Sequence, residues 1–207
     1  MKGWWLAGMA LAAPASAAEK PVYAPPPAWV IPAPAPDPAK LGDDAPLFLT
    51  LDTQDRLADG TVWSYHDIAT RMATPEVVQQ AGTITLDWQP AKGDLTIHRV
   101  EILRGAQHLD ALAGGKTFTV IRREQQLERQ SIDGQLTATL PVEGLQVGDV
   151  LRVTFSTSRH EDALGGAVQD AALVATEPAR IGFARTRLDE VTKLLASDEA
   201  KQKLDAA

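Results

Sequence analysis

Three observations predict that this 207-residue chain is all-β, a two-sheet antiparallel β-sandwich. Apolar and polar residues alternate with a period of two in many short segments, which is the pattern of strands with one buried face. Glycines at 60, 82, 93, 105, 134 and 148 separate these segments. The clearest case is 136–158, where Pro141 and a glycine-rich turn separate two strands. In the second of these, Leu151, Val153 and Phe155 alternate with polar residues.

Taken in order, strands are expected at 47–52, 61–72, 83–88, 95–104, 116–122, 135–140, 151–158 and 180–188. Both faces of the 61–72 strand hold apolar residues, so it should be central. A short helix is predicted at 75–81, with Thr74 as N-cap, Pro75 at its first position and Gly82 after its end. Asp133-Gly134 is a hairpin signal into 135–140. Residues 189–207 change to helical spacing and predict an amphipathic C-terminal helix.

The N-terminus has the pattern of an export signal. Lys2 precedes an apolar run from Gly3 to Ala13, and Ala15-Ser16-Ala17 forms a small-x-small cleavage site, so residues 1–17 are predicted to be a signal peptide. The apolar run is too short to span a membrane, which takes about 20 residues, so no integral membrane segment is expected after cleavage. A periplasmic or secreted location follows. Residues 18–45 are rich in proline and alanine and predict a spacer, part of which lies against the domain at an edge.

Composition excludes several partners. The formal net charge is −7, which argues against nucleic acid and anionic membranes, because both require clustered lysine and arginine. The chain has no cysteine, so it has neither a disulfide nor a thiol nucleophile. The domain is expected to occupy 46–188, a size that can bury a core without disulfides.

Few residues suggest chemistry, and no catalytic, cofactor-binding or metal site is predicted. The four histidines lie on separate elements without metal-ligand spacing. A polar run near 122–130, together with two tryptophans that could stack on a ligand or pack in the core, makes a candidate interaction surface. Its residues are Trp63, Trp88, Arg122, Arg123, Gln125 and Arg129. The turn before residue 150 is marked as structural at Gly144, Gly148 and Asp149, and Gly148 is expected to need a positive φ.

Four segments of the chain resemble the family called domain of unknown function 3857. They are GTITLDWQP at 82–90, LTIHRVEILRGAQHLDAL at 95–112, FTVIRREQQLERQSIDGQLTATLP at 118–141 and EGLQVGDVLRVTFST at 143–157. The resemblance implies a β-rich module of exported bacterial proteins that precedes a transglutaminase-like domain using Cys, His and Asp. That catalytic domain is absent from this sequence, and the tail after 188 departs from the family pattern.

The expected function is therefore non-catalytic recognition of a protein or cell-envelope substrate, accessory to a transglutaminase-like or protease partner, with a peptide or glycan as ligand. A carbohydrate-binding or structural envelope module acting alone is the alternative. An enzyme with an unrecognised carboxylate site is a third reading.

Overall fold

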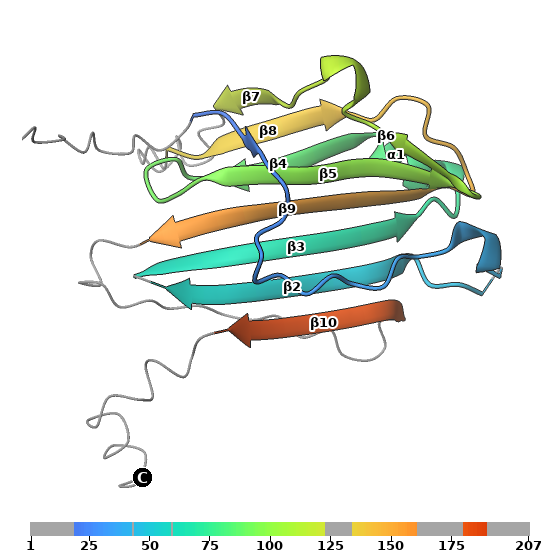
Figure 1. Ribbon diagram of the computed structural model, residues 1–207. Coiled ribbons are helices and arrows are strands. Elements are labelled where there is room, and N and C mark those ends of the chain that lie inside the picture. Colours follow the sequence, from blue (N-terminus) through green and yellow to red (C-terminus); the bar gives the residue numbers. More distant parts are fainter. Residues whose placement is uncertain (1–18, 43, 59, 123–133, 161–179, 190–207) are drawn as a thin grey trace, which may run out of the picture.

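The computed structural model describes residues 19–42, 44–58, 60–122, 134–160 and 180–189. They form two packed sheets (Figure 1), so the predicted all-β sandwich is confirmed. The larger sheet has the order β1-β5-β9-β3-β2-β10, with β6 also paired to β5, and the smaller has the order β4-β8-β7. The strands of the larger sheet are β1 (Val22–Tyr23), β2 (Phe48–Ala58), β3 (Thr61–Arg71), β5 (Leu95–Arg104), β6 (Gln107–Asp110), β9 (Val150–His160) and β10 (Ile181–Asp189).

The smaller sheet consists of β4 (Thr83–Trp88), β7 (Thr119–Arg122) and β8 (Leu136–Pro141). One helix, α1 (Pro75–Ala81), begins as predicted: Thr74 is its N-cap, and the Thr74 hydroxyl accepts a hydrogen bond from the Val77 N–H. Two short 3₁₀ turns, η1 (Pro38–Lys40) and η2 (Ala113–Gly115), lie in the connections. No helix of the described residues is long and apolar enough to cross a membrane. The predicted signal peptide and C-terminal helix lie outside the described residues, apart from Asp189 at the end of β10.

The prediction that all strands are antiparallel is wrong for the larger sheet. β10 pairs with β2 in parallel, with Arg185 opposite Asp52, and β1 pairs with β5 in parallel. Strand alternation shows which residues share a face but not the direction of the partner strand, which only the path of the chain determines. β3 lies between β2 and β9, so its predicted central position is correct.

The main core lies between the two sheets at the β5 and β9 end of the larger one. Alternate residues of β9, Leu151 and Val153, meet Ile84, Ala138 and the other buried side chains of the smaller sheet. In β5 the apolar phase changes, because the register shifts between Ile97 and Arg99. This bulge returns Val100 and Ile102 to the core and leaves Arg99 and Glu101 on the opposite face.

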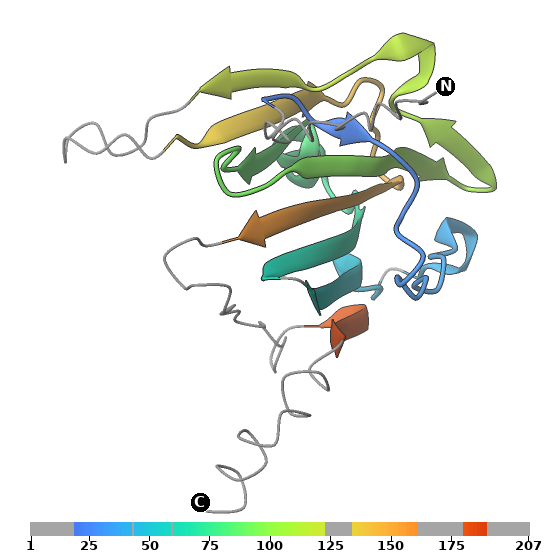
Figure 2. The ribbon, with the colours of Figure 1, turned by 60° about the vertical axis from the view of Figure 1, so that its left-hand side comes forward.

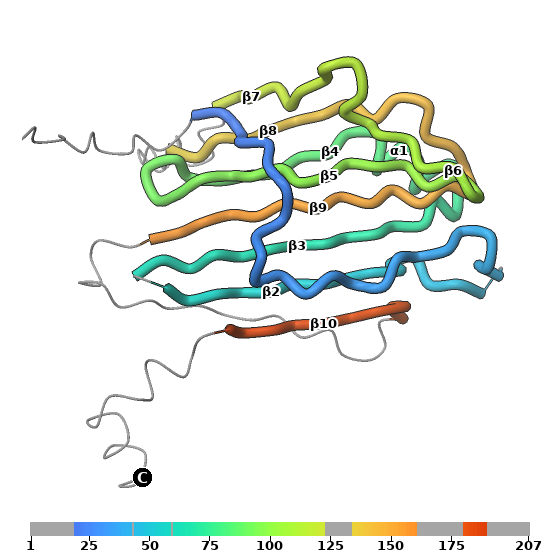
Figure 3. Tube along the Cα trace, viewed as in Figure 1, coloured from blue at the N-terminus to red at the C-terminus, as the bar shows by residue number. Residues whose placement is uncertain are grey.

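Part of the proline-rich segment lies against the domain, beginning at an edge of the larger sheet, where β1 pairs with β5. After β1 it crosses the larger sheet on the face away from the smaller sheet, passing β5, β9 and β3 to reach β2 (Figure 3). Figure 2 shows this segment in blue beside the larger sheet. Residues 24–33 are called the strap below.

Candidate functional site

The strap covers a polar sheet face that is buried despite its polarity. It is called the polar face and is formed by Asp52, Gln54, Tyr65, Asp67, Arg152, Thr154 and Ser156, all at most 7% exposed. Strand register places these residues in adjacent rows, with Asp52 opposite Asp67 and Asp67 opposite Thr154. Buried polar groups cost free energy unless they find partners, so the partners of this face decide its role.

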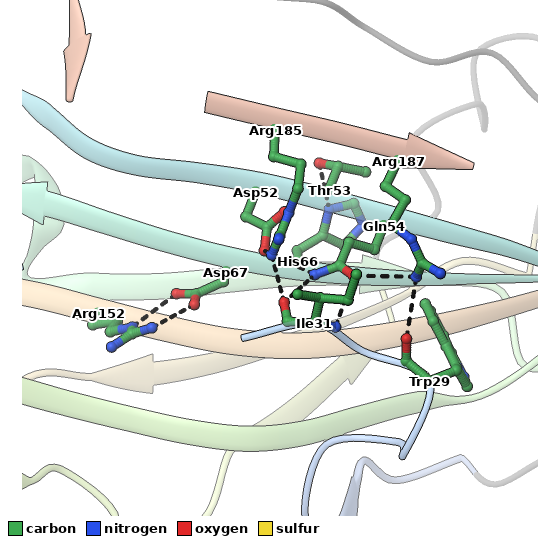
Figure 4. A network of polar contacts seen from close by, with 10 residues as sticks. All are labelled: Trp29, Ile31, Asp52, Thr53, Gln54, His66, Asp67, Arg152, Arg185 and Arg187. Atoms are coloured by element: carbon green, nitrogen blue, oxygen red, sulfur yellow. Dashed lines mark hydrogen bonds and ion pairs between the residues drawn. The ribbon is translucent and has the colours of Figure 1, made fainter. Parts of the chain in front are cut away.

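Two arginine–aspartate pairs satisfy most of its charge (Figure 4). Arg152 donates from Nε and Nη2 to the two carboxylate oxygens of Asp67 at 2.9 and 2.6 Å. Arg185 of β10 donates in the same way to Asp52 at 2.8 and 2.6 Å. Two parallel N–H donors matched to a carboxylate are the strongest form of ion pair in proteins, so both aspartates are held in fixed positions.

The strap is held through its main chain. Gln54 accepts from the Ile31 N–H at 3.0 Å and donates to the Ile31 carbonyl at 2.7 Å, and Arg185 also donates to that carbonyl. Arg187 donates to the Trp29 carbonyl at 3.1 Å (Figure 4). Because proline residues have no N–H, carbonyls are the groups that a proline-rich segment offers. The strap turns at residues 28–29, where the Val30 N–H donates to the Pro27 carbonyl at 3.1 Å, and side chains of the sheet bind its main-chain groups on both sides of this turn.

His98, at the bulge in β5, holds the other end of the strap. Its Nδ1 lies 2.8 Å from the Ala24 carbonyl, and its Nε2 lies 2.7 Å from the Ser156 hydroxyl. A carbonyl only accepts, so the Nδ1–H donates to it and Nε2 accepts from the Ser156 hydroxyl in the neutral ring. Burial lowers the pKa of His98, and the bond to the Ala24 carbonyl opposes that shift only in part. The neutral ring is therefore the form that fits beneath the strap.

The lowered pKa of His98 predicts an acid-sensitive contribution to stability. A group whose pKa is depressed on folding stabilises the native state above its unfolded pKa, about 6.5 for histidine, and this contribution is lost as pH falls through the folded value. We expect the free energy of unfolding to fall more steeply from about pH 7 to about pH 5 in the wild type than in His98→Gln. Urea titrations at each pH measure this difference. A slope in His98→Gln equal to that of the wild type would contradict the assignment.

A cavity of about 380 Å³ lies between the strap and the polar face, and it is called the strap cavity. Its floor is made by Tyr65, Asp67, Arg99, Arg152 and Thr154. Its other wall belongs to the strap and is apolar, formed by Pro26, Pro27, Ala28, Val30, Pro32 and Ala33. Cavities of this size hold small ligands or short peptide segments. Burial, with a contribution from the charge of Asp67, raises the pKa of Tyr65 to about 12, so its phenol stays protonated.

The Ser156–His98 contact has the distance of a nucleophile and its base, but the position of Ser156 in the sheet favours a structural role. Ser156 is 5% exposed, and it lies within β9, paired with Tyr65 on one side and Thr96 on the other. Nucleophilic catalysis also needs an open approach and oxyanion donors. The contact therefore fits a structural hydrogen bond that holds the ring facing Ala24.

Of the predicted interaction surface, the structure describes Trp63, Trp88 and Arg122, which lie on β3, β4 and β7. Trp63 is 41% exposed and shares a face of β3 with Tyr65, whereas Trp88 is 5% exposed and packs in the core. Trp88 also lines a second pocket, of about 300 Å³, with Asp87, Gln89 and Lys92 among its other lining residues. Arg122 lies on β7 in the smaller sheet, 3.8 Å from Glu19. Arg123, Gln125 and Arg129 lie outside the described residues.

The turn marked as structural has the expected geometry. Gly144 and Gly148 have φ values of 74° and 95°, which favour glycine. Asp149 is 2% exposed and accepts two hydrogen bonds from Arg104. Burial raises the pKa of Asp149, but the bonds from Arg104 and the Gln146 N–H outweigh it and lower the pKa. The turn thus anchors the start of β9.

Sequence reasoning missed the polar face. In the sequence, Arg152, Thr154 and Ser156 alternate with the apolar residues of the strand. This alternation shows that they share a polar face, but it predicts that solvent covers the face. Arg185 and Arg187 on the last strand repeat the spacing, but nothing local indicates that they meet Asp52 and Gln54. No group of His, Cys, Asp and Glu within the described ranges has the arrangement of a metal site.

This geometry defines the class of protein: a β-sandwich in which a proline-rich strap and a polar sheet face enclose a cavity of ligand size. Residues 58–194, about two thirds of the chain, match the model of the domain of unknown function with solved structure, DUF3857, and the chain belongs to that family. No curated protein matches. Among solved structures, a protein from Parabacteroides distasonis described as a putative protease aligns at 13% identity and a TM-score of 0.48. The alignment covers 54% of this chain and 22% of that one, and no conclusion about function follows from it.

Proposed function

We propose that this protein is a non-catalytic exported module that recognises a protein or cell-envelope substrate, accessory to a transglutaminase-like protease partner. The observation that carries the proposal is the strap, whose main chain is bound by side chains of the larger sheet beside a cavity that the polar face lines. The side chains are Gln54, His98, Arg185 and Arg187. Extended and proline-rich peptides are commonly recognised in this way, through main-chain hydrogen bonds and adjacent pockets. The signal-peptide pattern supports export, and the resemblance to modules that precede transglutaminase-like domains supports the partner.

The absence of cysteine supports the non-catalytic part of the proposal, because the related architecture uses a cysteine nucleophile. The charges of the polar face also support it. Asp67 and Asp52 are each bound on both carboxylate oxygens by an arginine, so neither has the free geometry of a general base.

Calorimetric titration of the mature chain with stem peptides released from bacterial cell wall tests the proposal. We expect measurable binding, and we expect at least a tenfold loss in the double variant Gln54→Ala/Arg185→Ala, because the strap then loses its anchor at Ile31 and the cavity loses a wall. This variant also leaves the buried Asp52 carboxylate without Arg185, so binding is compared at a temperature where circular dichroism shows the variant folded. Lys116→Ala, at an exposed pair with Glu143, is the control and should bind normally. Mass spectrometry of the peptides should show no turnover. Turnover that disappears in Ser156→Ala would make the protein an enzyme and overturn the proposal.

Trp63 favours one second candidate, a stand-alone carbohydrate-binding module. Its ring is 41% exposed on β3, and an exposed tryptophan ring can stack on a sugar. Oligosaccharides of the wall glycan, titrated into the wild type and Trp63→Ala, separate the two candidates. Glycan binding that requires Trp63, without any binding of stem peptides, would select the carbohydrate module.

A further inference from the structure

The lining of the strap cavity has more hydrogen-bond donors than acceptors. Arg152 uses two of its five N–H groups on Asp67, and its Nη1 lies 3.9 Å from Glu101, beyond hydrogen-bond distance. The Asp67 carboxylate is bound on both oxygens by Arg152, so it is not free to accept from a ligand. The cavity thus has N–H groups that can donate to a ligand, whereas the Asp67 carboxylate already accepts from Arg152 on both oxygens.

Thr154 supplies a second, independent sign of a ligand. Its side chain lines the cavity and is 3% exposed, yet its Oγ1 has no hydrogen-bond partner among the described residues. A buried hydroxyl without a partner costs free energy, and a bound molecule is one way in which such a group gains its partner. A ligand oxygen in the cavity would satisfy this hydroxyl.

The free guanidinium donors indicate which group the ligand presents. The lining carries two guanidinium groups, Arg99 and Arg152, and their charges are balanced by Asp67 and Glu101. In the described part of the chain Arg99 pairs with Glu101 at 3.3 Å, and its side chain is 53% exposed, so it can turn toward the cavity. The planar N–H donors that these pairs leave over match a carboxylate, which arginine binds with two parallel hydrogen bonds.

The apolar wall of the cavity determines which side chain can lie beside the carboxylate of the ligand. It consists of proline, alanine and valine side chains of the strap, which favour small apolar groups and offer no charge. A ligand that presents a carboxylate to the floor and a small apolar side chain to the strap satisfies both walls. A cavity of about 380 Å³ has room for one or two such residues.

We propose that the strap cavity binds the free carboxyl terminus of a short peptide with small apolar side chains. The inference rests on the proposed function and names the part of the substrate that is recognised. Arg99 and Arg152 bind the carboxylate, the Thr154 hydroxyl donates to it, and the proline-rich strap covers the terminal side chain. The same site would reject a peptide whose terminus is blocked as an amide, because the amide NH₂ would face guanidinium donors.

Titration of the mature chain with N-acetyl-alanyl-alanine and with its carboxamide tests this inference. The acid should bind at least tenfold more tightly than the amide. Arg99→Ala should weaken the acid at least tenfold without lowering the melting temperature, since Arg99 is half exposed. Thr154→Val, which keeps the shape and removes the hydroxyl, should weaken the acid severalfold and leave the melting temperature unchanged or raised. Lys116→Ala is the charge-matched control and should bind as the wild type does.

Different results would overturn the carboxylate site and the recognition function. Equal binding of acid and amide, or an unaffected Arg99→Ala, would overturn the carboxylate site while stem-peptide binding that depends on Gln54 and Arg185 would leave the recognition function intact. Inorganic phosphate that competes as well as the dipeptide acid would reduce the site to a general anion site and overturn the peptide terminus. Absence of binding by both the dipeptide and the stem peptides would overturn both proposals.

Discussion

Replacing Arg152 with methionine should lower the free energy of unfolding by about 3–5 kcal/mol, because it leaves the Asp67 carboxylate buried without its partner. Asp67 has 1% of its side chain exposed and Arg152 has 9%, and their closest atoms lie 2.6 Å apart. Methionine keeps much of the side-chain length, so the loss reports the missing cation more than a missing volume. Urea unfolding at neutral pH measures the change.

Lys116→Met is the matched control for this variant. It removes the same charge from an ion pair of similar length, 2.7 Å, in which the two side chains are 48% and 76% exposed. Exposed pairs contribute little to stability, so its unfolding curve should match that of the wild type. Equal effects of the two variants would show that burial does not govern the Arg152 pair.

Gly93→Ala should destabilise the fold at or above the upper end of the range of about 1–3 kcal/mol for overpacking. A Cβ atom at Gly93 would lie 1.9 Å from the backbone oxygen of Ser158, and a backbone atom cannot move aside as a flexible side chain can. The turn before β5 is fastened to β9 there, since the Asp94 N–H donates to Ser158 Oγ and the Ser158 N–H donates to the Asp94 carbonyl. The added methyl must push this turn away from the strand.

Thermal unfolding measures the effect, with an expected fall in melting temperature of about 6–12 °C for about 3 kcal/mol in a domain of this size. Gly42→Ala makes the same chemical change where no atom lies within 4 Å of the new Cβ and the glycine has no positive φ, so it should leave the melting temperature unchanged or slightly raised. A Gly93→Ala protein as stable as Gly42→Ala would mean that the turn does not approach β9 so closely.

The sequence by itself determined the local features of this protein. Alternation located the strands on either side of Gly148, the composition excluded thiol chemistry, and Thr74-Pro75 located the start of α1, because each of these depends on residues that are close in the chain. Ile97 and Val100 are three positions apart, whereas strand alternation requires a spacing of two, and this departure also indicated the bulge in β5. The need for a glycine at 148 could be stated because a tight turn between two strands requires a backbone conformation that other residues resist.

Tertiary structure alone decided the polar face and its cavity. Arg152 and Asp67 are 85 positions apart, and Arg185 and Asp52 are 133 apart, so their pairing depends on strand order and on the parallel pairing of β10 that no local pattern encodes. Alternation separates the apolar face of a strand from its polar face, but it does not say whether solvent or another segment covers the polar one. Here the strap covers it, because arginine, glutamine and histidine side chains from three strands, β2, β5 and β10, converge on carbonyls that its prolines leave available. The candidate site therefore exists only where segments remote in sequence meet.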